Sequence, residues 1–135
     1  MEHLPLTPED EELIEAAWAT LRRAFRPGRH GVAAAVRCES GRVYTGVNIE
    51  GIHGPCAEPI ALGAAFTNGE RVITTMVAVC KRSDGYPVLS PCGNCRQMLL
   101  DYSPQANVIL LDGGEVVKAR VCDLLPGAFT MDFED

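Results

Sequence analysis

Apolar positions recur on one helical face over residues 13–25, and apolar stretches and short alternating runs follow along the chain. The first helix is expected to begin at the cap Thr7 followed by Pro8, and to stop at Pro27-Gly28. The remaining helical stretches cover 57–66, 92–100 and, as a brief turn, 121–125. These stretches predict three helices and one shorter turn.

Runs rich in β-branched residues, bounded by glycine, proline or polar residues, predict the strands. They cover 32–36, 42–47, 72–79 and 108–111, and Val116-Val117 begins a fifth. Ser40-Gly41 joins the first two, which are expected to form an antiparallel hairpin, whereas helices between later strands favour parallel pairing with crossovers. The order of elements therefore predicts an α/β fold with a mixed sheet.

Length and composition are those of one globular domain. The chain has 135 residues, 47% of them hydrophobic, and no linker or repeat divides it, so residues 1–135 are expected to form a single domain. The acidic tail from about residue 132 is expected to be mobile. No apolar run approaches the roughly 20 residues of a membrane span, and the first residues lack the pattern of a signal peptide. We therefore expect a cytoplasmic protein that does not contact a membrane.

Charge and cysteine content narrow the class of ligand. The net charge is −6 and the pI is about 5.0, which opposes binding to the phosphate backbone of a nucleic acid. Six cysteines in a reducing compartment, two of them spaced Cys-x-x-Cys, favour metal binding over disulfides. A small, weakly charged molecule is the expected substrate.

Three cysteines and a glutamate form the most informative motif. Cys56 and Glu58 are separated by one residue, and Cys92 and Cys95 follow in a Pro-Cys-x-x-Cys sequence. Structural zinc sites usually have four protein ligands, whereas catalytic sites leave a position open, so three cysteines and a spare carboxylate favour a catalytic zinc site. Cys56 and Cys92 stand at expected helix starts, where partial positive charge lowers the pKa of a thiol.

The carboxylate and one arginine complete this predicted site. Glu58 lies in the first turn of its helix, where it can take a proton from a water molecule and pass it to a substrate. Three thiolates and Zn²⁺ sum to a charge of −1, and Arg96 is expected to compensate by donating hydrogen bonds to a ligand sulfur from outside the ligand set. The pattern predicts metal-assisted hydrolytic attack on an unsaturated carbon.

The chain resembles the small, single-domain cytidine deaminase family, and within that superfamily it is most similar to blasticidin S deaminase. Zinc deaminases carry such a Cys-x-Glu and Pro-Cys-x-x-Cys pair. The similar stretches are Tyr44-Thr45-Gly46-Val47-Asn48, Gly54-Pro55-Cys56-Ala57-Glu58, Leu89-Ser90-Pro91-Cys92-Gly93-Asn94-Cys95-Arg96-Gln97 and Leu124-Leu125-Pro126. The resemblance implies a three-layer α/β/α sandwich with a mixed five-stranded sheet, a homotetramer, and one Zn²⁺ per subunit.

The resemblance also assigns roles to residues. It implies that Cys56, Cys92 and Cys95 bind zinc, and that Glu58 activates water and protonates the ring nitrogen before ammonia leaves. Substrate contacts are implied for Asn48 and Glu50, which would hold a ribose hydroxyl, for Ala57, and for Phe129, which would reach a neighbouring subunit's pocket. The implied activity is deamination of cytidine, deoxycytidine, blasticidin S or a similar cytosine-containing compound.

Three departures separate this chain from its relatives. Pro59 stands where cytidine deaminases usually have an arginine, which places more weight on Arg96. Arg29 or His30 occupies the position of a phenylalanine that stacks on the base. Glu50 follows the cytidine deaminases, since blasticidin S deaminase has a tyrosine there. The sequence around the metal motif thus resembles blasticidin S deaminase, whereas the loop that carries Asn48 and Glu50 resembles the cytidine deaminases.

Two other functions compete with this interpretation. The same cysteines could form a non-catalytic zinc-binding domain, with His53 as a conceivable fourth ligand, although its glycine-containing loop favours a substrate-side or solvent position. Cys92 and Cys95 also resemble a thiol redox motif, which needs neither Cys56 nor Glu58. The cysteines outside the motif are expected to be small buried hydrophobes, namely Cys38, Cys80 and Cys122.

Overall fold

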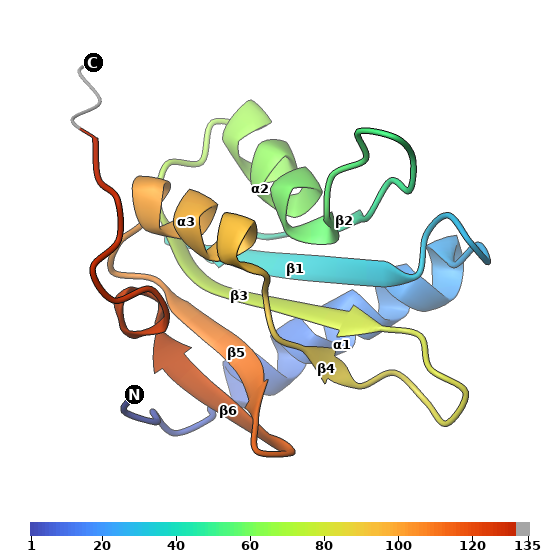
Figure 1. Ribbon diagram of the computed structural model, residues 1–135, viewed down its shortest axis with the longest axis horizontal. Coiled ribbons are helices and arrows are strands. Elements are labelled where there is room, and N and C mark those ends of the chain that lie inside the picture. The colour runs from blue at the N-terminus through green and yellow to red at the C-terminus, as the bar shows by residue number, and fades with distance from the viewer. Residues whose placement is uncertain (132–135) are drawn as a thin grey trace.

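In the computed structural model, which describes residues 1–131, the apolar runs of the sequence become the strands of one mixed sheet (Figure 1). Its main path, in the spatial order β2-β1-β3-β5-β6, consists of β1 (Val32–Cys38), β2 (Val43–Val47), β3 (Ile73–Cys80), β5 (Asn107–Asp112) and β6 (Glu115–Arg120). Strand β1 is antiparallel to β2 and β3, β3 is parallel to β5, and β5 is antiparallel to β6. The predicted hairpin and mixed sheet are confirmed.

A sixth strand was not predicted. Strand β4 (Val88–Leu89) pairs with β3 in antiparallel orientation through Ala78 and Leu89. Two residues are too few to produce a periodic pattern, so sequence alone gave no signal for it. The five-stranded path is present as expected, with β4 added beside β3.

Helices cover both faces of the sheet, which confirms the three-layer sandwich. Helix α1 (Pro8–Ala24) lies on one face, and α2 (Ala57–Thr67) and α3 (Gly93–Tyr102) lie on the other (Figure 1). A 3-10 turn, η1 (Val121–Leu124), follows β6. Helix α1 begins as predicted, because Thr7 and Asp10 bond reciprocally in a capping box.

Apolar residues of the central strands are buried on both faces of the sheet. Along β1, Ala33 and Ala35 belong to the core under α1, whereas Ala34 and Val36 belong to the core under α2 and α3. Strand β3 divides in the same way, which explains its nearly continuous apolar sequence. The two cores fix the helices, and hence the starts of α2 and α3, against the sheet.

Three further expectations bear on the rest of the chain. Cys38 and Cys80 are buried as predicted, but Cys122 is exposed, because it lies in the 3-10 turn outside the two cores. The expected mobile tail from residue 132 lies outside the described residues. Within residues 1–131, no helix is long and apolar enough to cross a membrane.

Candidate active site

The starts of α2 and α3 bring three thiols together. Cys56 is the N-cap of α2, Cys92 is the N-cap of α3, and Cys95 lies within the first turn of α3. The thiols of the two N-cap residues meet across the gap between the helix starts. The Sγ atoms of Cys56 and Cys92 are 3.8 Å apart, those of Cys92 and Cys95 are 3.5 Å apart, and all three lie within 4.8 Å of one another.

This sulfur triangle fits a zinc ion. Tetrahedral Zn²⁺ with Zn–S bonds of about 2.3 Å separates its sulfur ligands by about 3.8 Å, close to the two Sγ–Sγ distances given above. His53 is exposed and does not belong to the group of metal-ligating side chains found in residues 1–131. The protein therefore offers three ligands, which leaves a fourth position for a reactant.

Electrostatics of the three thiols also favour a cation. Burial, together with hydrogen bonding and repulsion from neighbouring thiols, raises the pKa of Cys56, opposite to the lowering expected at a helix start, and burial and the Glu58 carboxylate raise the pKa of Cys95. Burial opposes ionisation of Cys92 as well, but hydrogen bonds from Cys95, Cys56 and Asn94 lower its pKa overall. If all three were ionised, sulfurs this close would repel one another, so a divalent cation is the natural counter-charge for the three thiolates.

Glu58 places a buried carboxylate next to the sulfurs. It is the second residue of α2 and only 4% exposed. Burial raises its pKa, against the opposing hydrogen bonds from its own backbone and from Cys95. A carboxylate in these surroundings can exchange protons with a water molecule or a ring nitrogen.

A pocket of about 270 Å³ opens over this cluster. Its lining includes six residues predicted to form the site, namely Asn48, Glu50, Cys56, Ala57, Glu58 and Cys92. The lining also includes residues to which no role was assigned, namely Val32, Gly54, Pro55, Leu89 and Ser90. Leu89 and Ser90 precede the second cysteine motif, and Gly54 and Pro55 precede the first. For these four residues, proximity to a motif was the sequence feature that could have predicted a place in the pocket lining.

Asn48 is held rigidly at the rim of the pocket. Its Oδ1 accepts a hydrogen bond from the Val32 amide at 3.0 Å, and its own amide donates to the Val32 carbonyl at 3.1 Å. The His30 ring bonds through Nδ1 to the Asn48 carbonyl at 2.8 Å. Because Oδ1 is already engaged, the side-chain NH₂ is the group that Asn48 can offer to a ligand.

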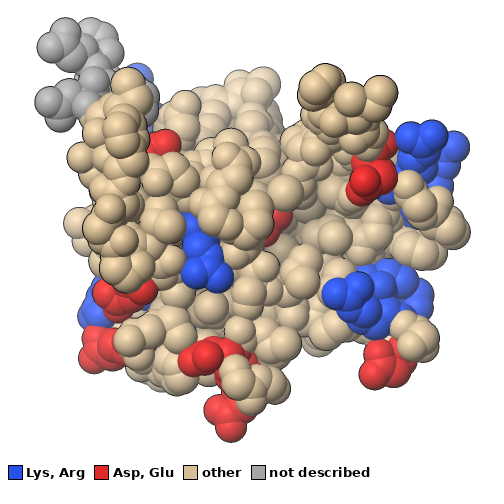
Figure 2. All heavy atoms as spheres, viewed as in Figure 1, with Lys and Arg blue, Asp and Glu red and all other residues tan. Residues whose placement is uncertain are grey.

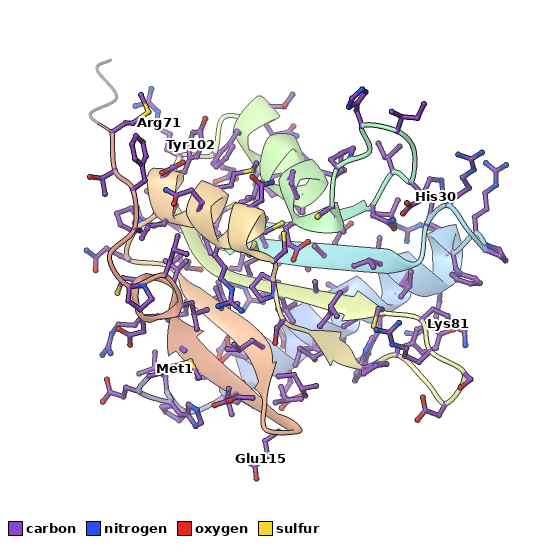
Figure 3. All side chains as sticks on the ribbon, in the orientation of Figure 1. Met1, His30, Arg71, Lys81, Tyr102 and Glu115 are labelled. Atoms are coloured by element: carbon purple, nitrogen blue, oxygen red, sulfur yellow. The ribbon has the colours of Figure 1, made fainter. Side chains whose placement is uncertain are left out.

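The two candidates for the base-stacking position lie outside this pocket lining. His30 belongs to the segment that leads into β1 (Figure 3) and contacts Asn48. Arg29 donates from Nη1 to the Glu50 carbonyl at 3.1 Å. Apolar surface beside the sulfurs comes instead from Val32 and Leu89.

Arg96 and Phe129 lie apart from the pocket. Arg96 donates from Nε to the Pro91 carbonyl at 2.8 Å and from Nη1 to the Leu124 carbonyl at 3.0 Å, so these bonds join the approach to α3 with η1. Phe129 is 71% exposed, and its carbonyl accepts a hydrogen bond from Gln97 at 3.0 Å. Pro59 is the third residue of α2, where a helix has no use for a backbone N–H, so it fits without loss of a hydrogen bond.

Comparisons with known proteins match the chain to deaminases. The family model for the cytidine and deoxycytidylate deaminase zinc-binding region matches residues 7–111. The chain is 35% identical to a blasticidin-S deaminase of Bacillus cereus over 138 residues, covering 96% of this chain and 99% of the relative. It is 34% identical to a cytidine deaminase of Halalkalibacterium halodurans over 126 residues, covering 89% and 93%.

A solved structure extends the agreement to three dimensions. The crystal structure of cytidine deaminase from Burkholderia pseudomallei matches with a TM-score of 0.74 and 32% identity, covering 92% of this chain and 100% of that one. The resemblance inferred from the motifs is thereby confirmed, including its relation to both blasticidin-S and cytidine deaminases. The chain belongs to the cytidine and deoxycytidylate deaminase family and is an aminohydrolase of that family.

Proposed function

We propose that this protein catalyses zinc-dependent hydrolytic deamination of a cytosine-containing nucleoside or nucleoside-like compound, of the cytidine, deoxycytidine or blasticidin S type, with release of ammonia. The observation that carries the proposal is the position of Glu58, a buried carboxylate that lines the same pocket as the sulfurs of Cys56 and Cys92. A purely structural zinc site would not need that carboxylate, and a site with three protein ligands leaves room for a reactant.

In this proposal the three cysteines hold one Zn²⁺ per subunit. The bound ion would supply Lewis acidity, which brings the pKa of a water molecule close to neutrality. Glu58 then takes one proton from the attacking water and delivers it to the ring nitrogen; it afterwards takes the second proton, from the hydroxyl added to the ring carbon, and delivers it to the departing amine, which leaves as ammonia. The first-turn amide of Ala57, which has no partner within its helix, is available to bind a substrate oxygen.

Further contacts fix the substrate and the assembly. Asn48 donates to a sugar hydroxyl through its NH₂, and Glu50 accepts from one. Arg96 supplies positive charge near the metal, although within residues 1–131 its side-chain hydrogen bonds go to the Pro91 and Leu124 carbonyls and not to a ligand sulfur as expected. The 71% exposure of Phe129 is consistent with a homotetramer in which this ring enters a neighbouring subunit's pocket. A cytoplasmic location would keep the three thiols reduced.

Replacement of Glu58 by Gln tests the mechanism. The variant should bind zinc as the unchanged protein does, since Glu58 is not a ligand, but its kcat for ammonia release should fall by about 10²- to 10⁴-fold. Zinc is measured by elemental analysis, and deamination by ultraviolet absorbance together with ammonia release. Full activity of the Gln variant would refute the assigned role.

The same measurements separate the competing functions. A non-catalytic zinc domain would contain stoichiometric zinc and turn over none of cytidine, deoxycytidine or blasticidin S. A dithiol redox protein would act without metal, and it would lose activity on replacement of Cys92 but not of Cys56. The proposed deaminase requires both cysteines and loses activity when its zinc is removed.

A further inference from the structure

A second pocket, of about 300 Å³, adjoins the candidate active site. Its lining contains the basic side chains of Arg29, Lys81 and Arg82, and we call it the basic pocket. It shares Val32, Asn48, Glu50 and Leu89 with the pocket over the sulfurs. Because ligand pockets usually measure about 300–1,000 Å³, the active-site pocket alone is small, and one ligand could extend through both.

Strand pairing holds the basic residues at one edge of the sheet. Val32, the first residue of β1, pairs with Cys80, the last residue of β3. The Lys81 amide then donates to the Gly31 carbonyl at 3.0 Å, so the segment before β1 runs beside the segment after β3. Arg29 lies on the first segment, and Lys81 and Arg82 lie on the second, which means that the sheet itself brings these charges together. Figure 2 shows two groups of basic atoms at this edge, on the right of the view, each with acidic atoms beside it.

These cations have no acidic partner in the described part of the chain. Within residues 1–131, no ion pair includes Arg29, Lys81 or Arg82. Arg29 donates to the Glu50 carbonyl, and Lys81 donates to the Arg82 carbonyl at 2.7 Å. Carbonyl partners orient a cation without neutralising it. The lining includes one carboxylate, that of Glu50, against three cations, in a protein whose net charge is −6. Such a concentration of positive charge favours an anionic ligand.

We propose that the basic pocket binds an anionic group, a phosphate or a carboxylate, on the sugar side of the cytosine-containing substrate. The inference rests on the proposed function, because the position of the reacting amine over the sulfurs sets the direction of the ligand. Asn48 and Glu50, the proposed sugar contacts, line both pockets. The anion therefore lies beyond the sugar, away from the base. Guanidinium groups suit both anions because they donate paired hydrogen bonds.

The test compares substrates that differ in one group. Holoenzyme is assayed with cytidine, cytidine 5′-monophosphate, cytidine 5′-carboxylate and the neutral cytidine 5′-carboxamide, which matches the carboxylate in shape. The kcat/KM of an anionic substrate should exceed that of the carboxamide by about tenfold or more. The two anionic substrates distinguish phosphate from carboxylate, and the preference should weaken with added salt.

Arg82→Glu is the most direct variant, because no side-chain hydrogen bond or ion pair of Arg82 occurs within residues 1–131. It should lower the ratio of anionic to neutral kcat/KM by about 10- to 100-fold. Arg42→Glu makes the same change of charge on an exposed side chain at the opposite end of β2 and should leave the ratio unchanged. An equal effect of the two variants would overturn the proposal.

A binding measurement that needs no turnover separates failure of this inference from failure of the proposed function. Calorimetry on holoenzyme compares uridine 5′-monophosphate with uridine, for the unchanged protein and for Arg82→Glu. If none of the substrates is deaminated but the monophosphate binds at least about tenfold more tightly in an Arg82-dependent way, the basic pocket stands and the proposed reaction fails. If cytidine, its carboxamide, its carboxylate and its monophosphate are all deaminated equally well and uridine binds as tightly as its monophosphate, the reaction stands and the anion site is refuted.

Discussion

At the scale of single residues, Asn48 and Glu50 differ in how firmly the fold holds them. Asn48 is tied to Val32 and His30 through its side chain and both backbone groups. Glu50 is held through its backbone, since its amide donates to the Arg29 carbonyl at 3.2 Å and its carbonyl accepts from the Arg29 guanidinium. Its exposed carboxylate is free to adjust. Asn48 thus supplies a fixed donor for a ligand, and Glu50 an adaptable acceptor.

Glu50→Ala should therefore affect recognition of the sugar and little else. Removal of the acceptor should raise KM for cytidine by about 10- to 100-fold, while free cytosine, which lacks the sugar, should change by less than about twofold. The backbone bonds to Arg29 remain, so the loop keeps its shape. Steady-state kinetics with both substrates check this, and Glu50→Gln, which retains an acceptor, is the matched control. Equal losses on cytidine and cytosine would show that Glu50 does not contact the sugar.

Residue identities could be predicted where the chemistry is local in sequence. Cys92 and Cys95 lie within one helical turn, and Cys56 and Glu58 lie within another. Their spacing and their positions at helix starts could therefore be predicted from the sequence. The hydrogen bond from Arg96 to the Leu124 carbonyl could not, because it joins positions 28 residues apart. No pattern in either segment points to the other. The sequence therefore indicated the metal-binding chemistry, but it did not reveal how the second helix start is braced.

At the scale of elements, one glycine sets how closely α2 approaches the sheet. A Cβ added to Gly46, in β2, would lie 2.7 Å from the backbone nitrogen of Ala61 and 2.7 Å from the Ile60 side chain. Backbone atoms cannot move away as a flexible side chain can. Helix α2 carries Cys56 at its cap and Glu58 in its first turn, so its distance from β2 also sets the depth of the site.

Gly46→Ala should push α2 outward and destabilise the protein. Overpacking of this kind costs about 1–3 kcal/mol in the free energy of unfolding, and zinc affinity should fall because Cys56 moves with the helix. Urea unfolding and a competitive zinc titration measure the two effects. Gly63→Ala is the control within α2, because its added Cβ would meet nothing within 4 Å, and it should stabilise the helix by up to about 1 kcal/mol. Equal stability of the two variants would contradict the close-packing argument.

Elements were predictable in proportion to their length. Helix α1 combines a capping box with seventeen residues of amphipathic sequence, and its start was predicted correctly, although it ends at Ala24 and not at Pro27-Gly28. Strand β4 has two residues, and it exists because β3 offers a pairing edge at Ala78 and Val79. That edge is a tertiary feature. Leu89 lies in a stretch that carries the family resemblance, but its place in the pocket lining depends on this tertiary pairing and was not predicted.

At the scale of the whole molecule, a buried ion pair joins helix α1, near the N-terminus, to strand β6. Lys118 of β6 donates from Nζ to the Asp10 carboxylate at 2.7 Å, and both side chains are almost fully buried. Asp10 also caps the start of α1, and Leu4 pairs with the Lys118 backbone. The pair spans 108 positions in sequence, so neither residue could be assigned a role beforehand. It anchors α1 and the N-terminal segment to β6 on the face of the sheet opposite α2 and α3.

Lys118→Met should be strongly destabilising without direct damage to the site. It leaves the Asp10 carboxylate buried and without its cation, which costs about 3–5 kcal/mol in the free energy of unfolding. Asp10→Asn combined with Lys118→Met removes both charges and should recover a large part of that loss. Urea unfolding of the single and double variants gives the coupling. Because α1 lies across the sheet from the sulfurs, the folded fraction of the single variant should keep the zinc content of the unchanged protein. A double variant no more stable than the single one would mean that Lys118 acts through packing of its aliphatic stem, and that the charge of Asp10 does not determine the stability of this end of the sheet.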